Sequence, residues 1–210
     1  LAYELQERDR GFHIAALMLG AVPAAEPRER YSGYDVNATT PVYKDDIVFI
    51  TSGYKTGGRA LRVSATRAEV LWTNKAIASH HSDPYIIDGC IYGYSGDSIQ
   101  NRGAFKCVDL QTGEEKWSTN DMGWGTCQYV DGYLLCMDIK GNLFLMQPAP
   151  TEFKLVTKLP EALGRVRHAT WTIPVVANGK LYLRYKQQLR CYQLTPPEPA
   201  TAPATKDSTE

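Results

Sequence analysis

The sequence lacks several features that would assign it to a familiar class. No apolar run reaches the roughly 20 residues that a membrane-spanning helix needs, so no membrane span is predicted. The 23 Lys and Arg balance the 23 Asp and Glu, and this lack of basic excess argues against nucleic acid as the main partner. The haem attachment motif C-x-x-C-H is absent, and the five cysteines do not have the spacing of a metal site. We therefore predict no metal site.

Strong helix-forming stretches are also few, whereas aromatic residues are frequent and include 13 Tyr. This balance favours β structure. The composition, 43% hydrophobic and 22% charged, is that of a globular chain, and 210 residues suffice for one large or two small domains.

A hairpin pattern recurs along the chain. An apolar run, a turn of Asp-Gly type and a second apolar or aromatic run appear four times, and the second turn residues are Asp46, Gly89, Gly132 and Gly179. These positions are separated by 43, 43 and 47 residues. Asp-Gly and Asn-Gly suit two-residue hairpin turns, because both turn residues need positive φ. A period of about 40–50 residues with four strands in each unit is typical of β-propeller blades.

A second pattern lies between the hairpins. A strand, a turn and another strand end in Trp72 in one copy and in Trp117 in the next, 45 residues later. The third copy, residues 142–147 followed by 153–157, lacks the tryptophan, and the last copy stops after its third strand. The predicted fold is therefore all-β, an incomplete propeller of four-stranded antiparallel blades, with about three full blades and a partial blade at each end.

The positions of the repeats divide the chain into three regions. Residues 1–33 are expected to be the end of a preceding blade and a connection, and residues 34–195 the blades. Residues 196–210, rich in Pro, Ala and Thr, are expected to be disordered. Residues 14–25 also look like the core and cleavage site of a signal peptide, but the repeat favours a strand there. An open arc would leave apolar blade faces bare, so we expect the rest of a larger propeller or another chain to close the ring.

The copy at residues 104–117, with Cys-Val-Asp-Leu, Thr-Gly-Glu and then Trp, resembles the PQQ-like (quinoprotein-like) repeat. The resemblance covers about residues 34–194. It implies a bacterial protein exported to the periplasm or the cell exterior. It also implies that Trp72 and Trp117 pack between neighbouring blades.

Quinoprotein alcohol dehydrogenases share this repeat, and the resemblance implies what such an enzyme would need. These enzymes hold PQQ between a tryptophan and a disulfide of adjacent cysteines, and they bind calcium through acidic and amide side chains. No two cysteines are adjacent here, and no acidic cluster has calcium-ligand spacing. We therefore predict no cofactor and no catalytic residue. The leading hypothesis is a non-catalytic module that binds a protein or carbohydrate on a propeller face, and the alternative is a fragment of a PQQ-dependent dehydrogenase.

The position eight residues before each turn gives the candidates for a ligand site. The innermost strand of each blade lines the central channel, so His81, Trp124 and Trp171 should lie at similar depth there. Asn37 and His80, each one residue before an aligned position, are further candidates. Two interpretations stay open. The rings could form an aromatic pocket for a planar or sugar-like ligand, or they could simply pack the channel.

The cysteines have separate roles in this register. Cys107 and Cys191 occupy one repeat position, which is typical of small buried packing residues. Cys127 and Cys136 should face each other across the hairpin that turns at Asp131-Gly132. In an exported protein they could form a disulfide, or they could stay as two thiols.

Overall fold

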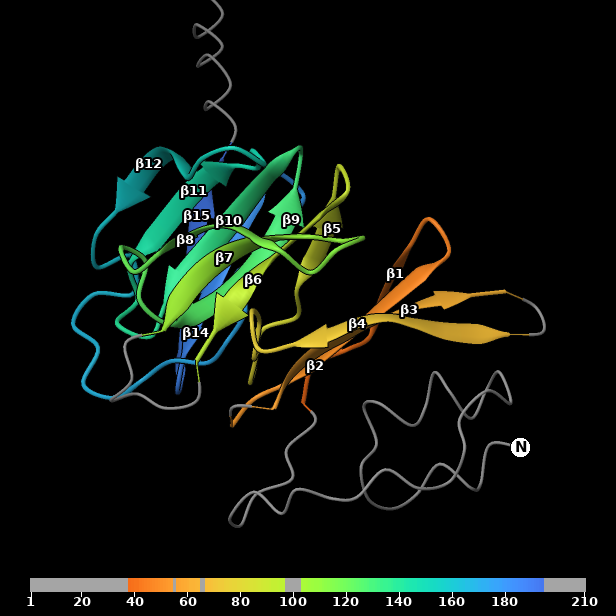
Figure 1. Cartoon of the computed structure of the whole chain (residues 1–210). Coiled ribbons are helices and arrows are strands. Elements are labelled where there is room, and N and C mark those ends of the chain that lie inside the picture. The colour runs from red at the N-terminus through yellow and green to blue at the C-terminus, as the bar shows by residue number, and fades with distance from the viewer. Residues whose placement is uncertain (1–37, 55, 65–66, 97–102, 195–210) are drawn as a thin grey trace, which may run out of the picture.

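The structure is a computed structural model that describes residues 38–54, 56–64, 67–96 and 103–194. Within these residues the regular elements are β-strands, and they form four antiparallel sheets in which each strand pairs with the next one along the chain. These sheets are the predicted blades, and we call them blades 1 to 4. Figure 1 shows blade 1 in orange at one side and blades 2 to 4 beyond it.

Three blades have four strands, and the last has three. Blade 1 contains β1 (Val42–Lys44), β2 (Ile47–Ser52), β3 (Gly57–Val63) and β4 (Ala68–Asn74). Blade 2 contains β5 (Tyr85–Ile87), β6 (Cys90–Ser95), β7 (Ala104–Asp109) and β8 (Glu115–Thr119). Blade 3 contains β9 (Gly125–Val130), β10 (Tyr133–Asp138), β11 (Leu143–Gln147) and β12 (Lys154–Leu159). Blade 4 contains β13 (Val175–Ala177), β14 (Lys180–Tyr185) and β15 (Gln188–Gln193).

The four predicted hairpin turns are confirmed. Both residues of each turn have positive φ, from 48° at Asp88 to 81° at Gly132. The strands on either side pair directly next to the turn, as Val130 does with Tyr133. The turn chemistry therefore sets the register of the two inner strands of every blade.

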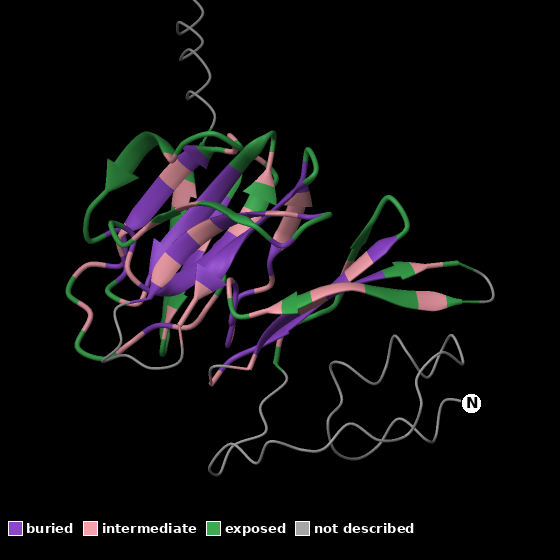
Figure 2. Cartoon of the chain, viewed as in Figure 1, coloured by how far each residue is buried: buried purple, intermediate pink, exposed green. Residues whose placement is uncertain are grey.

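How far a strand is buried depends on its position within its blade. The second strands β2, β6 and β10 are buried along most of their length, because they lie deep in their blades (Figure 2). In β14 the buried residues Leu181 and Leu183 alternate with the exposed Lys180 and Arg184. Such alternation indicates a strand with one face in the core and the other in solvent.

Apolar clusters fill the three seams between consecutive blades. The first seam, between blades 1 and 2, contains Phe49, Ile91 and Val108. The second, between blades 2 and 3, contains Tyr92, Phe105 and Phe144, and the third, between blades 3 and 4, contains Leu135, Leu143 and Leu181. No such cluster of described residues joins blade 4 to blade 1, so the blades form an open arc.

Trp72 and Trp117 each lie in a seam. The indole N–H of Trp72 in blade 1 donates to the carbonyl oxygen of Leu110 in blade 2, at 2.9 Å. That of Trp117 in blade 2 donates to the carbonyl oxygen of Ala149 at the β11–β12 connection of blade 3, at 2.8 Å. Each tryptophan thus combines an apolar contact with a polar link to the next blade.

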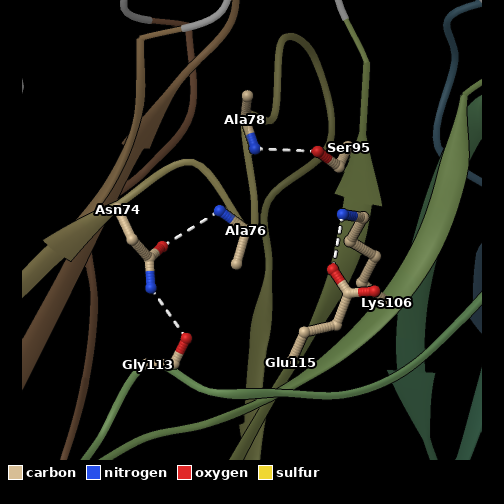
Figure 3. Close-up of polar contacts among 7 residues, drawn as sticks. All are labelled: Asn74, Ala76, Ala78, Ser95, Lys106, Gly113 and Glu115. Atoms are coloured by element: carbon tan, nitrogen blue, oxygen red, sulfur yellow. Dashed lines mark hydrogen bonds and ion pairs between the residues drawn. The ribbon is translucent and has the colours of Figure 1, made fainter.

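Polar side chains support the first seam around Trp72 (Figure 3). The side-chain amide of Asn74 donates to the carbonyl oxygen of Gly113 in blade 2 at 2.7 Å, and its oxygen accepts the N–H of Ala76 at 3.0 Å. The same view shows Ser95 accepting the N–H of Ala78, at 3.0 Å. Asn74 therefore joins β4, the last strand of blade 1, to the turn between β7 and β8 of blade 2.

The free face of blade 4 is partly the bare apolar surface that the sequence suggested, since Leu189 and Val175 are 68% and 47% exposed there, but it also carries charged side chains. Lys180 and Arg184 are exposed there, beside exposed Val175 and Cys191. Cys191 is therefore not the buried residue expected from its repeat position. Its counterpart Cys107 is buried in the second seam, whereas no further blade among the described residues covers blade 4.

Two expectations lie outside the described residues. These are the partial blade or signal peptide of residues 1–33 and the tail of residues 196–210. The described residues include no helix that is long and apolar enough to cross a membrane.

Candidate functional site

The predicted aromatic residues of three blades come together in one cluster. His81 lies on the approach to β5, Trp124 directly before β9 and Trp171 on the approach to β13. The ring centroids of His81 and Trp171 are 4.9 Å apart, and those of Trp124 and Trp171 are 4.8 Å apart. We call His80, His81, Trp124 and Trp171 the inner aromatic cluster. Its members occupy the segments that lead into the innermost strands rather than the strands themselves.

His80 links the cluster to blade 1. Its ring lies 3.7 Å from that of His81 and 5.8 Å from that of Trp124, centroid to centroid, and it stacks on the latter. Tyr54, in the loop after β2, contacts His80 edge-on, with ring centroids 4.6 Å apart. Tyr54 was not predicted, although Gly53 before it marks the loop after β2. Asn37, also predicted for this site, lies outside the described residues.

Backbone hydrogen bonds hold two members in place. The carbonyl oxygen of Trp124 accepts the N–H of Ile139 at 2.9 Å, and the carbonyl oxygen of Ile139 accepts the N–H of Thr170 at 3.1 Å. The hydroxyl of Thr126 donates to the carbonyl oxygen of Thr172 at 3.0 Å. Trp124 and Trp171 are therefore positioned by a ladder that runs from blade 3 to the entry of blade 4.

Two glycines allow the loops to approach the cluster closely. A β-carbon on Gly53 would lie 3.0 Å from the β-carbon of His80, and one on Gly103 would lie 2.7 Å from that of Trp124. Both glycines belong to the connections between the second and third strands of their blades. Their lack of a side chain lets the backbone at Gly53 and Gly103 approach the side chains of His80 and Trp124 closely.

Two members of the cluster are buried and two are partly exposed. Trp124 and His80 are 5% and 7% exposed, whereas His81 and Trp171 are half-buried. Desolvation lowers the pKa of His81 from its ordinary value of 6.5. Half-buried rings with low charge can stack on a planar or sugar-like group. Among the described residues, no three His, Cys, Asp or Glu side chains are placed to hold a metal ion.

The lowered pKa of His81 makes stability depend on pH. Because the folded state holds the proton more weakly than the unfolded state, falling pH favours unfolding once it passes the ordinary value of 6.5. We expect the melting temperature of the His81→Gln variant to fall less than that of the unmodified protein between pH 7.5 and pH 5. Thermal unfolding at matched pH values measures this. Identical pH profiles for the two proteins would contradict the burial of a neutral His81.

The predicted register of Cys127 and Cys136 is confirmed, since the two residues are directly paired between β9 and β10. Both are buried and are free thiols in this structure. Burial raises the pKa of Cys136 well above its ordinary value. The hydroxyl of Ser82 lies 3.6 Å from the sulfur of Cys127. The pair therefore packs as small buried side chains.

Thiol labelling should separate Cys191 from the other four cysteines. Cys191 is exposed, the others are buried, and burial raises the pKa of Cys107 to about 12. We expect one thiol to react quickly with iodoacetamide in native buffer and all five to react in denaturant without reductant, as read by mass spectrometry. Two fewer labelled thiols in denaturant would reveal a disulfide instead.

Comparison with known proteins places the fold. Residues 20–119 match the family model described as "Outer membrane protein assembly factor BamB". BamB from Moraxella catarrhalis superposes with a TM-score of 0.50 at 16% identity, over 69% of this chain and 39% of that one. The PilY1 C-terminal domain from Pseudomonas aeruginosa superposes with a TM-score of 0.50 at 14% identity, over 68% of this chain and 42% of that one. The computationally designed Ika4 protein superposes with a TM-score of 0.53 at 11% identity, over 81% of this chain and the whole of the designed one.

The chain is therefore an incomplete β-propeller of four-stranded blades. It carries PQQ-like repeats and is similar to BamB in part of its sequence and in fold. It spans about two fifths of the length of the Moraxella BamB structure. At these identities the solved structures show the fold alone. None of the curated proteins compared is detectably similar in sequence.

Proposed function

We propose that the chain is a non-catalytic binding module that presents the inner aromatic cluster to a protein or carbohydrate ligand. The observation that supports this most strongly is the contact of His81, Trp124 and Trp171, which come from the entries to three different blades. A cluster assembled from separate repeats with two half-buried rings offers a stacking surface held by the scaffold.

The likeness to BamB supports a protein partner and an exported location, in the periplasm or outside the cell. BamB is described as an outer membrane protein assembly factor, and that description applies to BamB itself. For this chain we propose that a propeller face binds its ligand, and that further blades or another chain close the ring.

Binding assays on the cluster test this proposal. Soluble β-linked oligosaccharides and a library of unstructured peptides would be titrated while tryptophan fluorescence is followed. We expect at least one probe class to bind and the Trp171→Ala variant to weaken it about tenfold or more, since a stacked ring contributes roughly 1–2 kcal/mol. Tyr43→Ala, at an exposed tyrosine in β1 of blade 1, is the matched control. Equal binding by the Trp171→Ala variant, or no binding of either class, would refute the proposal.

The second candidate is a fragment of a PQQ-dependent dehydrogenase, which the PQQ-like repeat favours. Calcium with PQQ needs a set of oxygen ligands. Among the described residues, no three carboxylate, histidine or cysteine side chains are grouped as a metal-ligand set. Added PQQ with CaCl₂ would give a bound chromophore and dye-linked alcohol oxidation if this candidate is right. Absence of both would count against it.

A further inference from the structure

One repeat position differs between the three seams. Trp72 pairs with Ala60 in blade 1, Trp117 pairs with Cys107 in blade 2, and each pair lies directly beside a β-bulge. In blade 3 the pair beside the bulge is Thr157 with Leu145. Thr157 is therefore the structural counterpart of the two seam tryptophans.

A second ring is also missing from the third seam. Phe49 lies 5.5 Å from Trp72, and Tyr92 lies 6.0 Å from Trp117, centroid to centroid. Each of these residues is the third after the second residue of its hairpin turn, and the same position in blade 3 is Leu135. The third seam thus lacks both aromatic rings that fill the other two. At the repeat position of Ala60 and Cys107, blade 3 has the larger Leu145, whose side chain fills part of the volume left by the missing rings.

The space left by these differences is a pocket of about 290 Å³. Its lining includes Thr157 and apolar side chains of both blades, namely Leu135, Leu145, Val176, Leu181 and Leu194. This size is at the lower end of ligand pockets, which run from roughly 300 to 1,000 Å³. Thr157 and Leu194 in the lining are exposed, so the pocket is open to solvent and a ligand can enter it directly.

The polar groups at the pocket match those around the seam tryptophans. The N–H of Leu194 donates to the carbonyl oxygen of Gly179, as that of Leu110 does to the carbonyl oxygen of Gly89. Leu194 is thus the counterpart of Leu110, whose carbonyl oxygen accepts the indole N–H of Trp72. Asp131 also lines the pocket and offers a carboxylate acceptor.

We propose that the pocket in the third seam binds a planar aromatic group of indole size that carries one N–H donor. Such a group would occupy the volume that Trp72 and Trp117 fill in the other seams. Its N–H would meet the carbonyl oxygen of Leu194, the hydroxyl of Thr157 or the carboxylate of Asp131. The ring could belong to a free heterocycle or to a tryptophan side chain of a peptide. This site is separate from the inner aromatic cluster and shares none of its residues.

Calorimetric titration of the full chain tests the proposal with three probes. Indole represents the free heterocycle, N-acetyltryptophanamide represents the peptide side chain, and 1-methylindole lacks the N–H. We expect saturable binding of indole and at least a fivefold weaker affinity for 1-methylindole. Binding of N-acetyltryptophanamide would assign the pocket to polypeptide ligands, and its failure alongside indole binding would assign it to free heterocycles.

The Thr157→Trp variant supplies the missing ring from the chain itself. We expect it to weaken indole binding at least tenfold and to raise the melting temperature by about 3 °C, because filling a cavity is stabilising. Lys158→Trp is the matched control. It adds the same ring to β12 beside the pocket, but Lys158 pairs with Phe144 and does not line the pocket. Should Thr157→Trp fail to fold, Thr157→Phe gives a smaller filling ring with the same expected direction.

Three results would overturn the proposal. They are the absence of saturable indole binding to the unmodified protein, equal indole affinity in the folded Thr157→Trp variant, and equal loss of binding in the Lys158→Trp control. Equal affinity for 1-methylindole would overturn the requirement for the N–H donor.

Discussion

Replacing Trp117 with alanine is expected to lower the free energy of unfolding by roughly 3 kcal/mol or more, as large-to-alanine changes at packed aromatic sites do. The Trp117 ring contacts Tyr92, Phe105 and Phe153, with centroids 5.9–6.3 Å apart. Its indole N–H also donates to the carbonyl oxygen of Ala149. The substitution therefore removes packing and a polar link from the second seam together.

Denaturant unfolding followed by circular dichroism measures this loss. Tyr43→Ala is the control, because Tyr43 is 62% exposed and surface substitutions usually change stability by about 0.5 kcal/mol or less. Trp117→Phe should fall between the two, since it keeps a ring but loses the N–H donor. If Trp117→Ala and Tyr43→Ala cost the same, Trp117 does not pack between blades.

The second large effect is expected at Gly125. A β-carbon there would lie 2.0 Å from the carbonyl oxygen of Met137, in the neighbouring strand β10. That backbone atom cannot move without separating β9 from β10, so we expect Gly125→Ala to destabilise the protein by roughly 3 kcal/mol. Trp124 is the adjacent residue, and we expect its fluorescence to change in the same variant.

Gly123→Ala gives a matched comparison for Gly125→Ala. Gly123 has φ of 61°, and a β-carbon on it would meet nothing within 4 Å. Alanine there costs only the left-handed backbone strain, about 1–2 kcal/mol. Thermal or denaturant unfolding of both variants separates the clash from the strain. An effect of Gly125→Ala no larger than that of Gly123→Ala would contradict the close approach of the two strands.

The repeat and its register could be predicted from the sequence because they depend on local chemistry. Asp-Gly and Asn-Gly turns fix where two strands meet, and the pairing of Cys127 with Cys136 follows from the turn alone. The period of the repeat also aligned His81, Trp124 and Trp171, whose rings then meet in the structure. Periodicity thus predicted which residues gather, since equivalent positions of neighbouring blades lie side by side.

Other features depended on contacts between blades that no local pattern encodes. The absence of a tryptophan in the third copy was visible in the sequence, but the pocket also depends on Leu135 and on side chains of blade 4. The exposure of Cys191 depends on what covers blade 4, which its own strand does not determine. Tyr54 reaches His80 through a loop with positive φ at the tyrosine itself, which is uncommon outside glycine.

The stacking of blades through their tryptophans can be tested directly by hydrogen exchange of the indole N–H groups. In ¹H–¹⁵N spectra of the labelled full chain, the indole N–H signals of Trp72 and Trp117 should exchange at least tenfold more slowly than in the unfolded chain, because each donates to a carbonyl of the next blade. Exchange of both as fast as in the unfolded chain would contradict the arrangement of the repeats as packed propeller blades.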